Sequence, residues 1–212
     1  MTMKPWDFDA QQNINFIMPG YWQYQALSAI ESGAPILNAA SSHDPARLHR
    51  FGAVNLDIRT PEELRRIGAQ VPPNYKHGSV FAIPFPDNHF QTVVLGEFLE
   101  HCVEEAAHKA VKECARVLRP TGRLIITVPL DGRPNGHNRP GFAEGSEPDE
   151  INHEEREWSE GVTSYHQTWW SNEMLHRLRN SIGFVEIQRI SLLYVFTAPI
   201  GGWGMVWEKP RT

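Results

Sequence analysis

The sequence predicts an α/β protein organised around a parallel sheet. Two apolar runs, residues 92–95 and 123–128, flank a long helical pattern, and neither run alternates between polar and apolar residues. Strands that are buried on both faces lose that alternation. Because a strand, a helix and a strand joined by short turns form a right-handed crossover, the two runs should lie parallel in one sheet.

Length and composition fit one domain spanning residues 1–212. The chain has 212 residues, 41% hydrophobic content and a formal net charge of −5, which allows a full core. The negative charge argues against a nucleic-acid partner, because no basic face would offset the phosphates. No run is long enough to span a membrane and the N-terminus lacks a signal-peptide core. We therefore expect a cytoplasmic protein, with Cys102 and Cys114 as reduced core residues.

Residues 1–33 are predicted to form an N-terminal arm followed by a helix. The helix begins at Tyr21 and is ended by Gly33, a residue typical of helix ends. Trp22 and Tyr24 crowd its first turn. These aromatic residues either cover the core or fold over a ligand.

The arrangement of a nucleoside-binding unit follows. A strand over residues 36–40 is followed by Asp44 and Pro45, a good N-cap and a good first helical residue. A second strand over residues 53–58 carries Asp57 near its end. In such units the terminal acid accepts hydrogen bonds from the ribose hydroxyls. An ordinary turn acid is the alternative for Asp57.

A short helix is predicted from Thr60 to Ile67, because Thr60 can cap it and acids occupy its first turn. Residues 71–74 are predicted to be a loop.

One long amphipathic helix is predicted between the two apolar runs. Its apolar positions recur every three or four residues: Leu99, Val103, Ala106, Ala107, Ala110, Val111, Cys114, Val117 and Leu118. Residues 119–122, Arg-Pro-Thr-Gly, should end the helix and turn the chain into the next strand. Glu100 and His101 would then lie in the first turn, where a dipole-favoured acid and a structural histidine are the simplest interpretation.

Residues 131–165 are predicted to form a lid-like insertion. This segment has few apolar residues and many Gly, Pro and acidic residues. Loops of this length are typical of lids, binding loops or disordered segments. His137 and His153, with His166 just after, allow either a general base or a metal site. Since no metal-ligand spacing is recognisable, we expect no metal.

The rest of the chain should add one helix and two strands. Ser171 is predicted to cap a helix that runs to about Ser181. Strands are expected over residues 185–195 and 204–208, with the glycine-rich residues 201–204 as the turn between them.

Three motifs in a consistent order resemble the second half of a class I S-adenosylmethionine (SAM) dependent methyltransferase of the small type 11 kind. They are IPFPDNHF at residues 83–90, LEH at residues 99–101 and RVLRPTGRL at residues 116–124. The resemblance implies a Rossmann-like, doubly wound fold. This fold has a mostly parallel seven-stranded sheet, helices on both faces and an antiparallel last strand.

The glycine-rich turn of that family is missing from this chain. Where the family has Gly-x-Gly-x-Gly after the first strand, this chain has Ala40, Ser42 and Asp44, and Asn38 replaces the usual acid. Glycine lets the backbone turn sharply and approach a ligand. We therefore expect Ala and Ser to replace glycine here only if φ stays negative. The alternatives are a retained SAM site with a narrowed or re-routed pocket and a pocket that has lost the cofactor, and we favour retained SAM binding.

The resemblance implies positions for the cofactor contacts. Asp57 would hold the ribose, Ser79 would meet the adenine amino group, the Val80 amide would face the adenine ring, and Glu97 would line the pocket at a strand end. The candidate cofactor-binding residues are Asn38, Ala40, Ser42, Asp57, Ser79, Val80 and Glu97. The candidate catalytic bases are His166, then His137 and His101, since histidine titrates near neutrality.

The expected function is methyl transfer from SAM to oxygen, nitrogen or carbon of a small molecule. One alternative is an inactive methyltransferase-fold subunit that binds a partner, in a homo-oligomer or with another protein. A second alternative keeps an enzyme but places another nucleoside compound in the pocket.

Overall fold

The computed structural model describes residues 34–41, 48, 51–130, 157–159, 162–163, 168, 170–195 and 199–211. The main sheet has seven strands: β1 (Ile36–Ala39), β2 (Val54–Asp57), β3 (Tyr75–His77), β4 (Phe90–Gly96), β5 (Leu118–Leu130), β8 (Val185–Val195) and β9 (Pro199–Glu208). The other elements are α2 (Pro61–Arg66), the 3₁₀ turn η2 (Leu99–His101), α3 (Glu104–Val117), α4 (Asn172–Ser181) and a separate pair, β6 (Glu157–Ser159) with β7 (Val162–Thr163).

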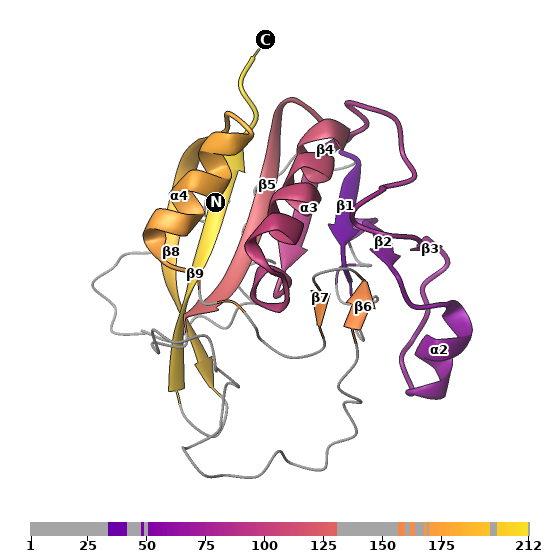
Figure 1. Ribbon diagram of the computed structural model, residues 1–212. Helices are drawn as coiled ribbons and strands as arrows, with labels where there is room; N and C mark the ends of the chain where they lie inside the picture. Colours follow the sequence, from indigo (N-terminus) through magenta and orange to yellow (C-terminus); the bar gives the residue numbers. More distant parts are fainter. Residues whose placement is uncertain are drawn as a thin grey trace, which may run out of the picture.

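The strand order is β3-β2-β1-β4-β5-β9-β8 (Figure 1). The first five strands in this order run parallel to one another, whereas β9 runs antiparallel to both β5 and β8. The predicted mostly parallel sheet with an antiparallel last strand is therefore confirmed. The strand order reverses between β1 and β4, which is where open α/β sheets bind ligands.

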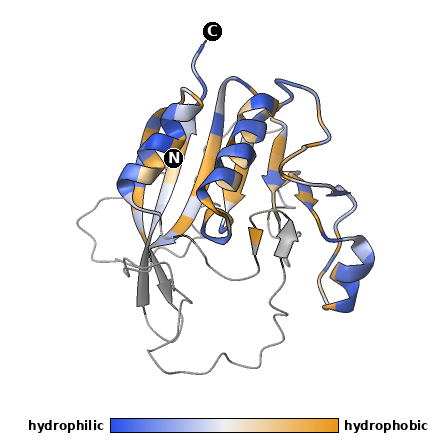
Figure 2. Cartoon of the chain, in the orientation of Figure 1, coloured by the Kyte–Doolittle hydropathy of each residue, from blue (hydrophilic) through white to orange (hydrophobic). Residues whose placement is uncertain are grey.

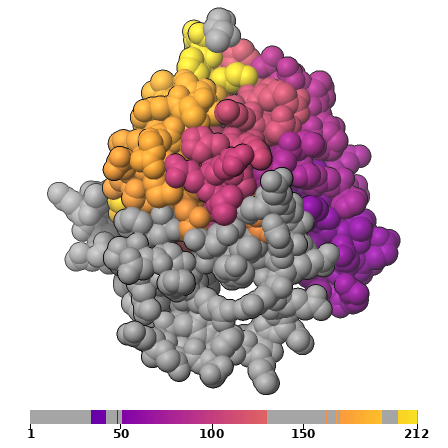
Figure 3. Space-filling view, viewed as in Figure 1, coloured from indigo at the N-terminus to yellow at the C-terminus, as the bar shows by residue number. Residues whose placement is uncertain are grey.

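Both faces of the sheet are buried. Alternate residues of the central strands join two separate apolar clusters, so Leu95 and Ile126 face one side while Val94 and Ile125 face the other. The helices α3 and α4 pack side by side on the first face, with hydrophilic outer surfaces (Figures 2 and 3). On the second face the structure describes Leu48 and Phe51, which pack against the other cluster.

Two of the predicted helices are confirmed with their caps. Thr60 and Glu63 form the reciprocal capping box of α2, which reaches Arg66 as expected within a residue. The Ser171 side chain accepts a hydrogen bond from the Met174 amide and begins α4, which ends at Ser181. In the described residues, no helix is both long and apolar enough to cross a membrane.

The long helix begins later than its periodicity predicted. Leu99–His101 is a separate 3₁₀ turn, and Cys102 is extended, with φ −106° and ψ 143°. Cys102 forms an isolated antiparallel bridge with Val162, and the indole Nε1 of Trp170 donates to the Leu99 carbonyl at 2.7 Å. This pairing with a distant segment overrides the local helical pattern, and places Glu100 and His101 in η2 rather than in α3.

The prediction of a turn at residues 201–204 is wrong. These residues lie inside β9, paired with residues 127–130 of β5. The β8–β9 ladder continues to the pair Val195 and Pro199, and residues 196–198 between them lie outside the described residues. The short strand β3 was not predicted, because its three residues include the exposed Lys76 and His77 and carry no apolar run.

Both cysteines are buried free thiols, as predicted. Burial raises the pKa of Cys102 well above its usual range and that of Cys114 to about 12. Both thiols therefore stay neutral and serve as packing groups.

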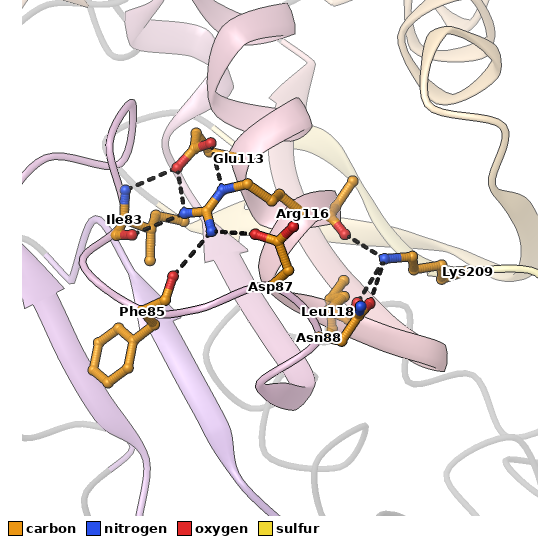
Figure 4. Close-up of polar contacts among 9 residues, drawn as sticks. Ile83, Phe85, Asp87, Asn88, Glu113, Arg116, Leu118 and Lys209 are labelled. Atoms are coloured by element: carbon orange, nitrogen blue, oxygen red, sulfur yellow. Dashed lines mark hydrogen bonds and ion pairs between the residues drawn. The ribbon is translucent and has the colours of Figure 1, made fainter.

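The C-terminal end of α3 has all four of its last carbonyl groups paired. The Lys209 ammonium donates to the carbonyls of Ala115 and Leu118, at 2.9 and 2.7 Å. The amides of Asn88 and His89 donate to the carbonyls of Arg116 and Val117, at 3.0 and 2.8 Å. Helix ends leave such groups without partners inside the helix. Here Lys209, the residue after β9, pairs with two of them (Figure 4), and the residues that lead into β4 pair with the other two.

Arg116 fastens the connection before β4 to the same helix. Its Nε and Nη2 each donate to the Glu113 carboxylate at 2.8 Å. Its Nη1 donates to the Asp87 carboxylate at 2.8 Å. The two terminal nitrogens also reach the carbonyls of Phe85 and Ile83, both at 2.9 Å (Figure 4). A planar guanidinium can make all of these bonds at once, which a lysine ammonium cannot.

The hydrogen bonds between Arg116 and Glu113 shift the pKa values of both residues. The hydrogen bonds from Arg116 hold the pKa of Glu113 below its ordinary value of 4.5, against the opposing effect of burial. The same bond, with that to Asp87, raises the pKa of Arg116. Glu113 also accepts a hydrogen bond from the Ile83 amide at 2.9 Å. The Glu113 carboxylate therefore binds the segment before β4 directly, through Ile83, and also through Arg116.

We predict that Arg116→Lys lowers the free energy of unfolding by about 2 kcal/mol, because at least two charge-assisted bonds are lost. Urea denaturation measures this loss. The matched control is Arg65→Lys, whose partner Glu62 is exposed and lies 3.2 Å away. The control should change stability by less than about 0.5 kcal/mol. If both variants lost equally little unfolding free energy, the Arg116 hydrogen bonds would contribute no more to stability than an exposed ion pair.

A pH prediction follows from the lowered pKa of Glu113. A carboxylate with a depressed folded pKa stabilises the fold above its unfolded pKa, and this contribution is lost as pH falls through the folded pKa. Glu113→Gln should therefore be clearly less stable than wild type at pH 7. Below about pH 4 the gap should narrow. Urea unfolding at several pH values provides the measurement, and a gap independent of pH would contradict the assignment.

Candidate functional site

The carboxyl ends of β1, β2 and β4 meet at one edge of the sheet. The register pairs Ala39 with Leu56 on one side and with Leu95 on the other. The residues that follow Ala39, Leu56 and Leu95 therefore lie close together at this end of the sheet. They include three predicted cofactor-binding residues, Ala40, Asp57 and Glu97.

Two of these residues have left-handed backbone conformations. Ala40 has φ +52° and Glu97 has φ +54°. The expectation that Ala could replace glycine here only with negative φ is wrong, since Ala40 adopts the conformation that glycine favours. An L-residue in this region costs about 1–2 kcal/mol, and such strain gathers at ligand sites and switch regions. The sharp turn after β1 is thus kept without its glycine.

Ser41 was not predicted to belong to the site. Its amide donates to the Leu56 carbonyl at 2.9 Å, which ties the turn to β2. Its hydroxyl is buried and has no hydrogen-bond partner among the residues that the structure describes. Leaving such a group unsatisfied costs about 1–3 kcal/mol, and a polar ligand group beside the turn would remove that cost. The predicted Ser42 lies outside the described residues.

Asp57 ends β2 and is 5% exposed. Its Oδ1 accepts the backbone amide of Arg59 at 3.0 Å and the Arg59 Nη1 at 3.3 Å. Its backbone carbonyl accepts the amide of Gly78 at 2.9 Å. The carboxylate is therefore held in place at the sheet edge, beside the loop that carries Ser79 and Val80.

Asn38 lies deeper in the sheet than the residues at its edge. It is buried, and its Nδ2 donates to the Asn55 Oδ1 at 2.9 Å. Asn55 in turn donates to the Ala53 carbonyl, as does Asn74 from the loop before β3. This chain of amides joins β1 to β2, so the Asn38 amide nitrogen serves the sheet. No local sequence pattern predicted that role.

An apolar wall lies next to Asp57. Val80 is buried in the core, and the Ser79 hydroxyl accepts the Phe81 amide at 3.1 Å. The rings of Phe81 and Phe98 lie tilted by 57° to each other, with centroids 6.3 Å apart. Two loops that follow different strands therefore meet through these aromatic rings. No local sequence pattern predicted that Phe81 belongs to the site, because its partner Phe98 follows a different strand.

Of the three predicted catalytic histidines, the structure describes one. His101 lies in η2, and its amide donates to the Phe98 carbonyl at 3.0 Å. It is therefore close in sequence and space to Glu97 and Phe98 at the sheet edge. His137 and His166 lie outside the described residues. In the part of the chain that is described, no three acidic, histidine or cysteine side chains lie together as a metal site.

The described end of segment 131–165, which was predicted to be a lid-like insertion, is attached beside η2. The described residues of segment 131–165 form the short β6–β7 ladder, which a featureless loop would lack. Val162 bridges to Cys102, and the Thr168 hydroxyl donates to the Cys102 carbonyl at 2.5 Å. The insertion thus returns to the chain next to His101. Residues 131–156 lie outside the described part.

The arrangement suits a nucleoside. A buried carboxylate can accept two hydroxyl groups, an apolar wall can cover a base, and a tight turn of small residues leaves room for a ligand close to the backbone. These groups come from the ends of four neighbouring strands, β3, β2, β1 and β4, around the point where the strand order reverses.

Comparison with known proteins supports this interpretation. Residues 42–126 match the sequence model of a family described as "Methyltransferase domain". A ubiquinone/menaquinone biosynthesis C-methyltransferase of Pasteurella multocida is 37% identical over 65 residues, which are 31% of this chain and 24% of that protein. The aligned part thus spans about a quarter of this relative's length.

Two solved structures share the fold over most of the chain. A SAM-dependent methyltransferase of Methanosarcina mazei has a TM-score of 0.66 at 16% identity, covering 93% of this chain and 100% of that one. The 1,6-didemethyltoxoflavin-N1-methyltransferase of Burkholderia thailandensis, solved with its namesake compound and S-adenosylhomocysteine, has a TM-score of 0.56 at 15% identity, covering 84% and 72%. Residues 42–126 therefore resemble a methyltransferase domain, and the chain has the fold of these solved SAM-dependent methyltransferases.

Proposed function

We propose that the protein transfers a methyl group from SAM to a small molecule. The observation that carries the proposal is the left-handed turn at Ala40 beside the buried Asp57. The chain keeps the turn's backbone at a cost in strain after losing the glycines, which indicates a continued need for its shape. The family match and the fold support the same conclusion.

The residues at the sheet edge fit this cofactor. Asp57 would accept the ribose hydroxyls, and the loop of Ser79 and Val80 would border the adenine. The buried hydroxyl of Ser41, which has no partner in the described part of the chain, is a further group that a polar ligand would satisfy. When bound, SAM supplies an electrophilic methyl group on its sulfonium, so the protein's main contribution is to align the acceptor.

The histidines are proposed to act on the molecule that accepts the methyl group. His166, His137 and His101 are the candidate bases for an acceptor that must lose a proton. His101 lies at the carboxyl edge of the sheet, beside the attached end of the insertion. A small-molecule acceptor and a cytoplasmic location remain predictions.

A non-catalytic, partner-binding subunit is the second candidate. It is favoured by the Asp57 Oδ1, which already accepts two hydrogen bonds from Arg59, and by the Asn38 amide that serves the sheet. Such a subunit, as a homo-oligomer or with a protein partner, would not bind S-adenosylhomocysteine. Another nucleoside ligand is the third candidate.

The test of the proposal is calorimetric titration with S-adenosylhomocysteine. Wild type should bind, and Asp57→Ala should weaken binding by about 2–4 kcal/mol, because two hydrogen bonds to a charged group are lost and water replaces part of them. That loss is about 30-fold to several hundredfold in Kd. Asp57→Asn should be milder, since one carbonyl oxygen remains as acceptor.

The matched control is Glu62→Ala, an exposed acid on α2, which should leave the Kd unchanged. Absence of wild-type binding would favour the non-catalytic subunit. Wild-type binding that is unaffected by Asp57→Ala would contradict the assigned ribose contact.

We also predict that Ala40→Gly stabilises the protein by about 0.5–1 kcal/mol. Relief of the left-handed strain at Ala40 outweighs the greater entropy of glycine in the unfolded chain. Ala39→Gly, at the buried neighbour with no such strain, should instead destabilise by about 1–2 kcal/mol. Thermal or urea unfolding of both variants tests this contrast, and equal losses would show that the turn at Ala40 is unstrained.

A further inference from the structure

The turn after β2 is held from β3 through its backbone carbonyl groups. The Tyr75 hydroxyl donates to the Arg59 carbonyl at 2.5 Å and lies 3.4 Å from the Asp57 carbonyl. His77 Nε2 lies 3.0 Å from the Ile58 carbonyl, and the Gly78 amide donates to the Asp57 carbonyl at 2.9 Å. Three consecutive carbonyls, those of residues 57 to 59, are therefore fixed by one short strand and the residue after it.

Fixing this turn also fixes the carboxylate. The Arg59 amide donates to the Asp57 Oδ1 at 3.0 Å, the Asx-turn contact between a side chain and the backbone two residues on. Arg59 Nη1 reaches the same oxygen. The direction of the carboxylate thus depends on Arg59, and the Arg59 backbone depends on the Tyr75 hydroxyl.

Tyr75 is suited to this task because its hydroxyl remains a donor. A hydroxyl has one proton, and the shorter distance assigns it to the Arg59 carbonyl. Burial, and then the charge of Asp57, raises the pKa of Tyr75 well above its ordinary value of 10.0. The phenol therefore stays protonated and keeps donating at every physiological pH.

We infer that Tyr75 is a positioning residue for the ribose contact, acting on Asp57 through Arg59. This inference rests on the proposed function, because it assumes that Asp57 accepts ribose hydroxyls. It assigns Tyr75 an effect on the ligand's diol, not on its base or its amino acid portion.

The test compares Tyr75→Phe with wild type for two ligands, S-adenosylhomocysteine and its 2′,3′-dideoxy analogue. The phenylalanine ring keeps the packing, so the variant should fold, as circular dichroism can verify. Its Kd for S-adenosylhomocysteine should rise by about threefold to tenfold, the loss expected for one hydrogen bond. Its Kd for the dideoxy analogue should change by less than about twofold, because this ligand lacks the hydroxyl groups that Asp57 would bind.

Two further variants support the comparison. Arg59→Gln keeps the backbone amide but removes the guanidinium, and should weaken diol binding selectively in the same way. Ser171→Ala removes the cap of the distant helix α4. It should lower stability without changing the ratio of the two dissociation constants.

The outcomes separate this inference from the proposed function. Equal weakening of both ligands by Tyr75→Phe, or no weakening of either, would overturn the positioning role while the cofactor assignment stands. If wild type binds neither ligand, the proposed function fails and the positioning role fails with it.

Discussion

The guanidinium of Arg116 makes five hydrogen bonds, two to Glu113, one to Asp87 and two to the carbonyls of Ile83 and Phe85. These bonds attach the connection before β4 to α3, while Asn88, His89 and Lys209 satisfy the helix's last carbonyls. The start of β4 is thereby set relative to α3 and to the last strand. All of β1 pairs with β4, up to the pair Ala39 and Leu95. The carboxyl end of β4 must therefore place Glu97 and Phe98 beside the turn at Ala40.

This constraint explains why the sequence predicted the fold better than the site. Residues 83–90 and 116–124 carry the strongest resemblance to the family, and they contain Arg116, Asp87 and the capping amides. Their side chains build the scaffold, away from the ligand edge. A motif made of scaffold contacts identifies the fold independently of the residues that line the pocket. The mostly parallel sheet with its antiparallel last strand was therefore predictable, while cofactor retention was not.

The site itself depended on contacts that local patterns do not reveal. Periodicity placed residues 99–101 in α3, but bridging of Cys102 to Val162 separated them. Asp57 was predictable from its place at a strand end, whereas Arg59 and Tyr75 matter only through the turn that they hold. The left-handed backbone of Ala40 could not be predicted either, because strain of about 1–2 kcal/mol is small against the packing of the strands around it.

A crystal structure of the protein with S-adenosylhomocysteine tests the central claim most directly, namely that the ends of β1, β2 and β4 still form a nucleoside site. We predict that Ala40 keeps its positive φ, that the ribose hydroxyls lie within hydrogen-bonding distance of the Asp57 carboxylate, and that the adenine lies against the loop of Ser79 and Val80. The account would be contradicted by a ligand bound elsewhere, or by crystals soaked at saturating concentration that leave this edge of the sheet empty.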